Sequence, residues 1–302
     1  MQSYYSNGKL LLTGEYVVLD GALALAVPTK LGQSLTVETI SEKVIKWTSF
    51  DSNKTIWYRN TFIFDNGGYK SENDDNTSLM LLKVFEAIKK LNPSFFNVKK
   101  GFLITTELNF PKNWGLGSSS TLINNIANWV NVDAYKLLNL TFGGSGYDIA
   151  CASHNLPITY LTKKYKRLIN EVSFNPNFLN HLFFVHLNQK QNSRDGIKHY
   201  NSNKGHITKE IKKISSITLK MTTCDTLNEF ERLVQKHESI ISKITKQETV
   251  KSRLFDDYTF GSIKSLGAWG GDFVLVTGTK ENMNYFESKG YKTIIAYKDM
   301  IL

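Results

Sequence analysis

The chain has 302 residues, of which 41% are hydrophobic, and a formal net charge of +10 at pH 7. This length and composition are typical of a globular protein with one large domain or two of ordinary size. No apolar segment approaches the roughly 20 residues of a membrane helix, and the first residues lack the basic and apolar regions of a signal peptide. We therefore expect a cytoplasmic protein without a membrane partner.

The cysteine and histidine content excludes two further classes. Cys151 and Cys224 are too few for a disulfide framework, and the six histidines show no zinc-binding spacing. The positive charge favours an acidic partner, which could be a nucleic acid, an anionic membrane or a phosphorylated small molecule. The basic runs at 163–167 and 204–220 accompany no nucleic-acid-binding motif. We expect no nucleic acid among the partners.

The amino-terminal part predicts a series of short strands. They are rich in β-branched and aromatic residues, and Gly, Asp and Asn separate them; their ranges are 9–13, 16–19, 22–27, 33–39, 44–50 and 56–64. The pair Asp20-Gly21 predicts a hairpin turn. A helical pattern follows, with Asn76 as its N-cap.

The segment 111–120, Pro-Lys-Asn-Trp-Gly-Leu-Gly-Ser-Ser-Ser, joins a predicted strand at 101–108 to a helix. Its two glycines let the backbone pass close to a ligand, and its serines precede a helix whose free N–H groups and dipole favour phosphate. A strand-to-helix turn with a serine N-cap explains the same residues without a ligand. The segment lacks the lysine of a P-loop, and Ser120 stands where a dinucleotide fingerprint needs a third glycine.

A second Gly/Ser cluster at 142–146 leads into another helix at Asp148, after a helical segment at 132–139. A strand at 156–162 precedes a basic, Asn-rich stretch at 163–180, which is the best candidate for a domain connection. Beyond it, a strand at 182–187, helices over 193–255 and a glycine cluster at 267–272 between two strands predict an α+β second domain. We expect two domains, 1–176 and 177–302.

Four segments together resemble the GHMP kinases, the superfamily of galactokinase, homoserine kinase, mevalonate kinase and phosphomevalonate kinase. They are the run 8–19 with its Gly-Glu-Tyr, the serine loop (residues 111–120), the cluster ending at Asp148, and the glycine cluster at 267–272. Gly-Tyr-Asp-Ile-Ala at 146–150 resembles the bacterial GHMP kinases named after that string, which are placed near the mevalonate kinases. The resemblance implies an α+β (α/β two-domain) fold, with a ribosomal-protein-S5-like N-terminal ATP-binding domain and a ferredoxin-like C-terminal domain.

The resemblance also implies ATP and Mg²⁺ as cofactors. It assigns the nucleotide phosphates to a continuous stretch of the serine loop, with Ser118 as the metal contact: Gly115, Leu116, Gly117, Ser118, Ser119 and Ser120. Asp148 matches the acid that faces the acceptor, although it could simply cap its helix. Lys9 matches the lysine near that acid, although it could be a surface lysine at a strand start.

The expected substrate-binding residues come from three segments. Gly-Glu-Tyr fits the first motif, the region after the strand 182–187 approaches the acceptor in related kinases, and phosphomevalonate kinases often carry Gly-Gly-Asp in the third motif. The residues are Glu15, Lys190, Arg194, Gly270, Gly271 and Asp272. For Lys190 and Arg194, a solvated strand-to-helix turn is an equal alternative. A phosphate acceptor needs a base less than an alcohol does, so Asp148 does not choose between the two substrates.

The chain departs from the family pattern at a few positions. Asn113, Trp114 and Trp269 replace smaller residues, and the usual metal-binding glutamate is not evident, since Asp133 is the only carboxylate between Thr121 and Tyr147. We expect an ATP-dependent kinase acting on mevalonate or phosphomevalonate in isoprenoid precursor synthesis. A sugar or homoserine kinase, a non-catalytic ligand sensor and a basic RNA-binding protein are the alternatives. The expected partners are ATP and a small-molecule substrate, and the chain could form a homodimer.

Overall fold

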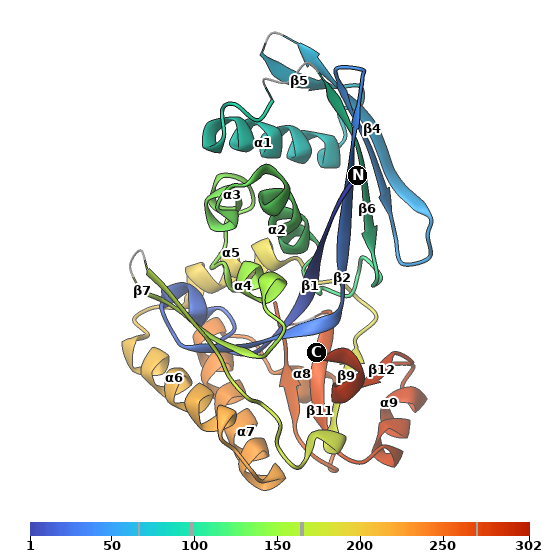
Figure 1. Ribbon diagram of the computed structural model, residues 1–302. Helices are drawn as coiled ribbons and strands as arrows, with labels where there is room; N and C mark the ends of the chain where they lie inside the picture. The colour runs from blue at the N-terminus through green and yellow to red at the C-terminus, as the bar shows by residue number, and fades with distance from the viewer. Residues whose placement is uncertain (66, 97–99, 164–165, 270) are drawn as a thin grey trace. The chain divides into compact units, whose positions relative to one another are not determined.

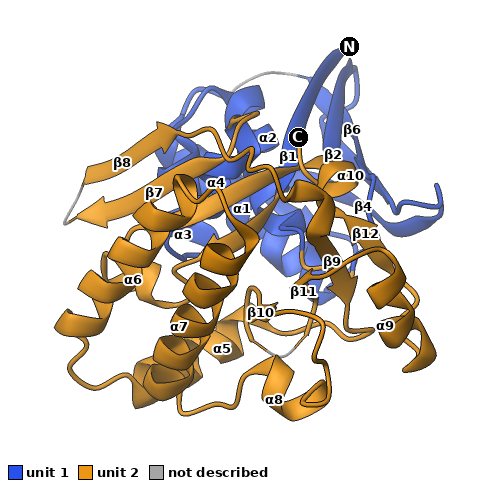
Figure 2. Ribbon diagram, turned by 90° about the horizontal axis from the view of Figure 1, so that it is seen from below, with its two compact units in different colours: residues 1–8, 31–112, 116–153 blue, residues 9–30, 113–115, 154–302 orange. Residues whose placement is uncertain are grey.

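The computed structural model describes residues 1–65, 67–96, 100–163, 166–269 and 271–302, and these form two compact units. Unit 1 comprises residues 1–8, 31–112 and 116–153, and unit 2 comprises residues 9–30, 113–115 and 154–302 (Figure 2). The long strands β1 (Gln2–Thr13) and β2 (Ala24–Ile40) each contribute to both units. The units alternate along the chain, and the domain division at 176 and 177 stays a prediction.

Unit 1 contains a twisted sheet in the order β5-β4-β3-β6-β2, with β3 and β6 parallel and the other pairs antiparallel. Four helices accompany it, and α1, α2 and α3 lie along one face of the sheet (Figure 1). Their apolar side chains share one core with those of the sheet. The elements are β3 (Val44–Phe50), β4 (Ile56–Asp65), β5 (Gly68–Ser71), α1 (Asn76–Leu91), β6 (Gly101–Leu108), α2 (Ser118–Val130), α3 (Ala134–Thr141) and α4 (Tyr147–Ser153).

Helix α1 shows how local sequence sets an element boundary. Asp75 is its N-cap, because the Asp75 carboxylate accepts hydrogen bonds from the backbone N–H groups of Thr77 and Ser78. The cap therefore lies one residue before the predicted Asn76. The apolar side chains recur at helical spacing and face the core of unit 1; they are Leu81, Val84, Phe85 and Ile88.

Of the strands predicted near the amino terminus, one was wrong and two others are continuous. Residues 16–19 do not form a strand, because the 3-10 helix η1 (Val17–Asp20) ends at Gly21 in the left-handed conformation, and so Asp20-Gly21 is not a hairpin turn. The predicted strands at 22–27 and 33–39 are parts of the single strand β2. A Cβ atom at Gly32 would lie 2.2 Å from the backbone oxygen of Ser6. This glycine marks a close approach of backbones rather than a break.

Unit 2 contains an antiparallel sheet in the order β10-β11-β9-β12, in which Val274 pairs with Val185. Within the predicted connection 163–180, β8 pairs with β7 in a hairpin next to β2. The strands are β7 (Ile158–Lys163), β8 (Lys166–Glu171), β9 (Leu182–His186), β10 (Ile263–Ser265), β11 (Phe273–Thr277) and β12 (Ile294–Ala296).

The remaining helices belong to unit 2, and α6 packs along α7. They are η2 (Leu179–His181), α5 (Ser193–Asn203), α6 (Thr208–Thr222), α7 (Leu227–Thr245), α8 (Val250–Leu254), η3 (Glu281–Met283), α9 (Asn284–Ser288) and α10 (Tyr297–Met300). Among the described residues, no helix combines the length and the apolar character that crossing a membrane requires.

Candidate functional site

The first half of the serine loop is held by the sheet of unit 2. Asn113, Trp114 and Gly115 belong to this unit, although the residues on both sides of them belong to unit 1. His186 Nδ1 accepts the N–H of Asn188 at 3.3 Å, so the ring proton is on Nε2, which donates to the Asn113 carbonyl oxygen at 3.2 Å. These contacts fix the backbone of the loop against the end of β9.

Trp114 anchors the same segment through its ring. It meets the ring of Phe273 edge-on, with a centroid separation of 5.3 Å, and lies 6.1 Å from the ring of His186. Aromatic pairs in this geometry stabilise by about 0.5–1.5 kcal/mol beyond the area that they bury. Trp114, which departs from the family pattern, therefore packs the loop onto β9 and β11.

Gly115 lies between a lysine and a carboxylate. Lys9 Nζ donates to the Gly115 carbonyl oxygen at 2.9 Å. A Cβ atom at Gly115 would lie 2.3 Å from the carboxyl group of Asp272, and its φ is +65°. Both the space and the backbone conformation thus require glycine here. Lys9, Gly115 and Asp272 form one contact group within unit 2.

Asp272 links this group to the segment after β9. Its backbone N–H donates to the Gln189 carbonyl at 2.7 Å, and its Oδ1 accepts the N–H of Gln191 at 3.4 Å. Its φ is +55°, a strained conformation for a residue other than glycine. Burial raises the pKa of the Asp272 carboxyl, and the charges of Lys9 and Lys190 oppose that shift. The carboxylate therefore contacts both the serine loop and the segment expected to bind the acceptor.

The other predicted substrate-binding residues after β9 and in the glycine cluster differ in exposure. Lys190 is exposed after β9, and Arg194 is exposed in the first turn of α5. Gly271 packs closely on this segment, because a Cβ atom there would lie 2.7 Å from the Gln191 nitrogen. Gly270 lies outside the described residues.

The second half of the serine loop begins α2 in unit 1. Gly117, with φ +91°, is the N-cap, so the N–H groups of the first turn lack partners within the helix. Ser118 is half-buried and Ser119 is exposed, whereas the buried Ser120 hydroxyl donates to the Gly117 carbonyl at 2.8 Å. The Leu116 side chain is fully buried. Leu116 and Ser120 can therefore offer a ligand only their backbone groups.

Asp148 lies in the first turn of α4, which packs against α2 within unit 1. Its side chain is half-buried, and Gly146 before it has φ +88°. Asp133, the only carboxylate between Thr121 and Tyr147, caps α3 by accepting the N–H of Lys136 at 2.9 Å. No group of three or more His, Cys, Asp or Glu residues that could hold a metal ion occurs among the described residues.

Glu15 lies in a sealed cluster of unit 2 that the sequence does not reveal. Its side chain is fully buried, and its Oε1 accepts a hydrogen bond from Lys264 Nζ at 2.5 Å. Lys264 also lies 3.3 Å from Glu238, whose other carboxylate oxygen accepts the N–H and the hydroxyl of Ser265. Glu238 thus accepts more side-chain and backbone hydrogen bonds than Glu15 does.

His237 packs against the second carboxylate oxygen of Glu15. Its Nε2 accepts the Gly14 N–H at 3.0 Å and lies 3.2 Å from Glu15 Oε2. Because Nε2 accepts the Gly14 N–H, it carries no proton, and its contact with Glu15 is not an ion pair. Burial raises the pKa of Glu15 to about 7 and lowers that of His237. Burial also raises the pKa of Glu238. Below pH 7, where Glu15 is mostly protonated, Lys264 and Glu238 remain as an ion pair.

These contacts give Glu15 a buried position facing Lys264 and His237, and its binding of substrate stays a prediction. Sequence reasoning missed His186, His237, Glu238 and Lys264. The partners of Glu15 come from α7 and β10, so no local spacing marks them. His186 offered a weak signal as a polar residue that ends an apolar strand.

No protein-family model matches the sequence significantly, and no curated protein does. Solved structures match over nearly the whole chain. Mevalonate kinase from Methanococcus jannaschii is 17% identical over 97% of this chain and 96% of its own, with a TM-score of 0.68. Phosphomevalonate kinase from Streptococcus pneumoniae, in complex with phosphomevalonate and AMPPNP, is 13% identical over 96% of each chain, with a TM-score of 0.68.

Galactokinase from Lactococcus lactis, complexed with galactose, is 13% identical over 100% of this chain and 93% of its own, also with a TM-score of 0.68. All three are GHMP kinases. The chain therefore has the α+β GHMP kinase fold, which confirms the predicted fold class.

Proposed function

We propose that the protein is an ATP-dependent phosphotransferase that moves the γ-phosphate of ATP to a small molecule. The observation that carries the proposal is the full-length match to kinases of three different acceptors. The glycine-capped start of α2 supports it, because free helix N–H groups and the helix dipole favour phosphate oxygens. A fold alone does not fix an activity, so the residues must supply the rest.

We assign the nucleotide phosphates to the backbone N–H groups of residues 115–120 and the hydroxyls of Ser118 and Ser119. Magnesium commonly keeps several waters and binds nucleotide phosphate oxygens, so a single protein oxygen can complete its coordination. The half-buried Ser118 hydroxyl at the start of α2 would be that oxygen. Bound Mg²⁺ would neutralise charge on the transferring phosphate. In this proposal Ser118 supplies one ligand from the protein.

The transfer forms a bond between an acceptor oxygen and the γ-phosphorus and breaks the bond between that phosphorus and the oxygen left on ADP. With an alcohol acceptor, Asp148 takes the hydroxyl proton as general base. Lys9 stabilises the negative charge of the transferring phosphate, and its bond to Gly115 holds its amine at the serine loop.

We propose mevalonate or its 5-phosphate as the acceptor, which would place the enzyme in isoprenoid precursor synthesis. Gly-Gly-Asp at 270–272 and Gly-Ser-Gly-Tyr-Asp at 144–148 favour the phosphorylated acceptor. The exposed Lys190 and Arg194 would bind its carboxylate or phosphate. The match to galactokinase supports a sugar kinase as the second candidate.

An ADP-release assay with Mg·ATP tests the activity against mevalonate, phosphomevalonate, galactose, homoserine and a heptose phosphate. Turnover with one acceptor supports the proposal and names the substrate. Absence of turnover with all of them, together with retained AMPPNP binding, would favour the non-catalytic sensor. For an alcohol acceptor, Asp148→Asn should lower kcat about 100-fold or more, and an unchanged kcat would refute its role as a base.

A further inference from the structure

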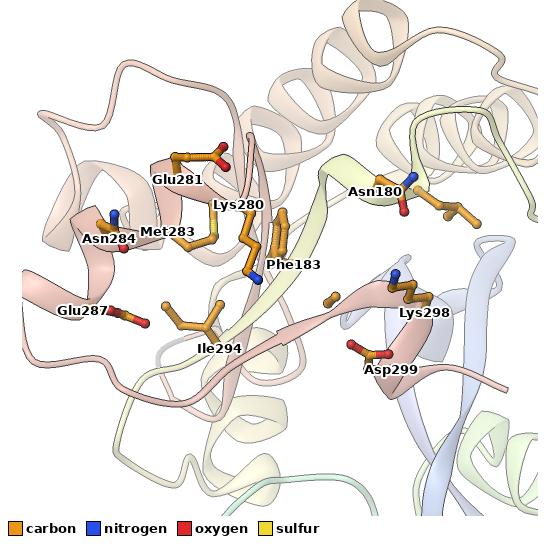
Figure 3. Close-up of a pocket in the computed structure, with 12 residues that line it drawn as sticks. Asn180, Phe183, Lys280, Glu281, Met283, Asn284, Glu287, Ile294, Lys298 and Asp299 are labelled. Atoms are coloured by element: carbon orange, nitrogen blue, oxygen red, sulfur yellow. The ribbon is translucent and has the colours of Figure 1, made fainter.

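Among the described residues of unit 2, three surface cavities lie outside the proposed reaction, and two of them differ clearly in the charge of their lining. One, of about 750 Å³, lies between η2, β12 and α9 (Figure 3). Lys280 and Lys298 line it together with Glu281, Glu287 and Asp299. Because both signs of charge are present in similar number, this cavity selects no class of ligand.

The second cavity, of about 570 Å³, is a groove between α6 and α7. Three of its lining residues are cations, Lys213, Arg232 and Lys236, and none is acidic. In the described part of the chain, no carboxylate lies within 4.0 Å of any of these three cations. Three like charges thus surround one groove without a counter-charge in contact, which an anion would supply.

The neutral lining residues suit an organic phosphate. Ser216, Gln235 and Ser239 can donate hydrogen bonds to phosphate oxygens. Ile217 is buried and Ile240 is half-buried, and these two side chains give the groove an apolar part. The volume lies within the range of about 300–1,000 Å³ that is usual for small-molecule sites.

The groove is held in shape from the opposite side of its helices. Ser215 and Thr218 of α6 bond the backbone N–H and carbonyl of Leu23, each at 2.9 Å. His237 of α7 accepts the Gly14 N–H at 3.0 Å. Figure 2 shows the two helices side by side in unit 2. A preformed site loses less conformational entropy on binding.

We propose that the α6–α7 groove is a binding site for a small phosphorylated molecule with an apolar body. Lys213, Arg232 and Lys236 bind the phosphate, and the apolar part of the ligand covers Ile217 and Ile240. This site is separate from the serine loop and does not depend on the proposed kinase activity.

The test uses hexyl phosphate as the probe and amine acylation of individual lysines, followed by mass spectrometry, as the readout. Acylation reports each lysine separately, so phosphate bound at the serine loop does not confuse the result. We expect hexyl phosphate to protect Lys213 and Lys236 in a saturable manner, while Lys280 and Lys298 label unchanged. Protection should weaken as salt rises.

Arg232→Gln is the matched variant, because it removes a groove cation and leaves both reporter lysines in place. It should raise the concentration needed for half-protection about tenfold or more, whereas Lys280→Gln, with the same change in charge, should not. Equal protection of all four lysines, or an unchanged Arg232→Gln, would overturn the proposal. If inorganic phosphate protected Lys213 and Lys236 at the same concentrations as hexyl phosphate, the proposed contact of the ligand with Ile217 and Ile240 would be wrong. Protection by an RNA oligonucleotide but not by hexyl phosphate would replace the proposed ligand class with a polyanion.

Discussion

Two lysines of unit 2 each face carboxyl groups, and their surroundings differ sharply. Lys264 is 1% exposed and lies between Glu15 and Glu238 in a cluster closed to solvent. Lys9 is half-buried, binds the carbonyl oxygen of Gly115 and feels the charge of Asp272. In the sealed cluster, charges must balance among the protein's own groups, because no water or ligand can compensate them. Lys9 is not closed off from solvent, so its charge can also interact with a bound anionic ligand.

The largest expected effect comes from removing the lysine of the sealed cluster. Lys264→Met leaves Glu15 and Glu238 buried without their cation, and breaking such a pair costs about 3–5 kcal/mol. We expect the free energy of unfolding, measured by urea denaturation at pH 7.5, to fall by about that amount. A loss below 1 kcal/mol would mean that the cluster is not sealed as the contacts indicate.

The matched change in the contact group of Lys9, Gly115 and Asp272 is Lys9→Met. It should lower the free energy of unfolding by less than Lys264→Met does, because a hydrogen bond from a charged group contributes about 1.5–3 kcal/mol and Lys9 is only half-buried. It should lower kcat/KM about 10²- to 10³-fold, the usual effect of removing one donor to a transition-state charge. Normal turnover with reduced stability would assign Lys9 a structural role instead.

Glu15→Gln tests whether the cluster around Lys264 makes the stability of the protein depend on pH. The pKa of Glu15 is raised to about 7 in the folded protein. Its contribution to stability is therefore complete below the unfolded pKa of about 4.5 and is lost as pH rises through 7. Glutamine cannot ionise, and its side-chain oxygen can still accept from Lys264.

We expect Glu15→Gln to be more stable than the wild type by about 1–3 kcal/mol at pH 8 and to differ little from it at pH 5. Unfolding free energies across this pH range provide the measurement. Glu238→Gln is the control, because it removes a carboxylate that accepts two bonds from Ser265 and should be destabilising at both pH values. Parallel pH profiles for wild type and Glu15→Gln would show that Glu15 is already ionised.

Local sequence predicted much of the fold. Periodic apolar residues indicated α1 and the strands of unit 1, and the fold class followed from four motifs in order. The failure at 16–19 has a local cause. Tyr16, with φ +62°, and Gly21 turn the chain into η1, although β-branched and apolar residues there favour a strand. Propensity reflects the side chains, whereas here the backbone is turned by hydrogen bonds from the Val17 N–H to the Glu15 carbonyl and from the Val18 N–H to the Gly14 carbonyl.

The candidate site was less predictable because its contacts join distant residues. The glycines and serines of the loop were visible as a local pattern. Trp114 became interpretable only when β9 and β11 brought His186 and Phe273 to its ring. Glu15 pairs with a lysine 249 residues away, so the motif that suggested substrate binding could not reveal its burial.

The close contact between Gly115 and the Asp272 carboxyl group can be tested with a single and a double variant. Gly115→Ala should weaken AMPPNP binding about tenfold, because its Cβ meets the Asp272 carboxyl and because φ +65° costs alanine about 1 kcal/mol. Adding Asp272→Gly removes the clash and relieves the strained φ at 272, so the double variant should bind more tightly than Gly115→Ala alone. Calorimetric titration of all three variants measures the coupling. If the losses of AMPPNP affinity in the two single variants add up in the double variant, Asp272 does not act on the loop through Gly115. Recovery of affinity in the double variant would mean that the Asp272 carboxylate positions Gly115, as Lys9 does through the Gly115 carbonyl.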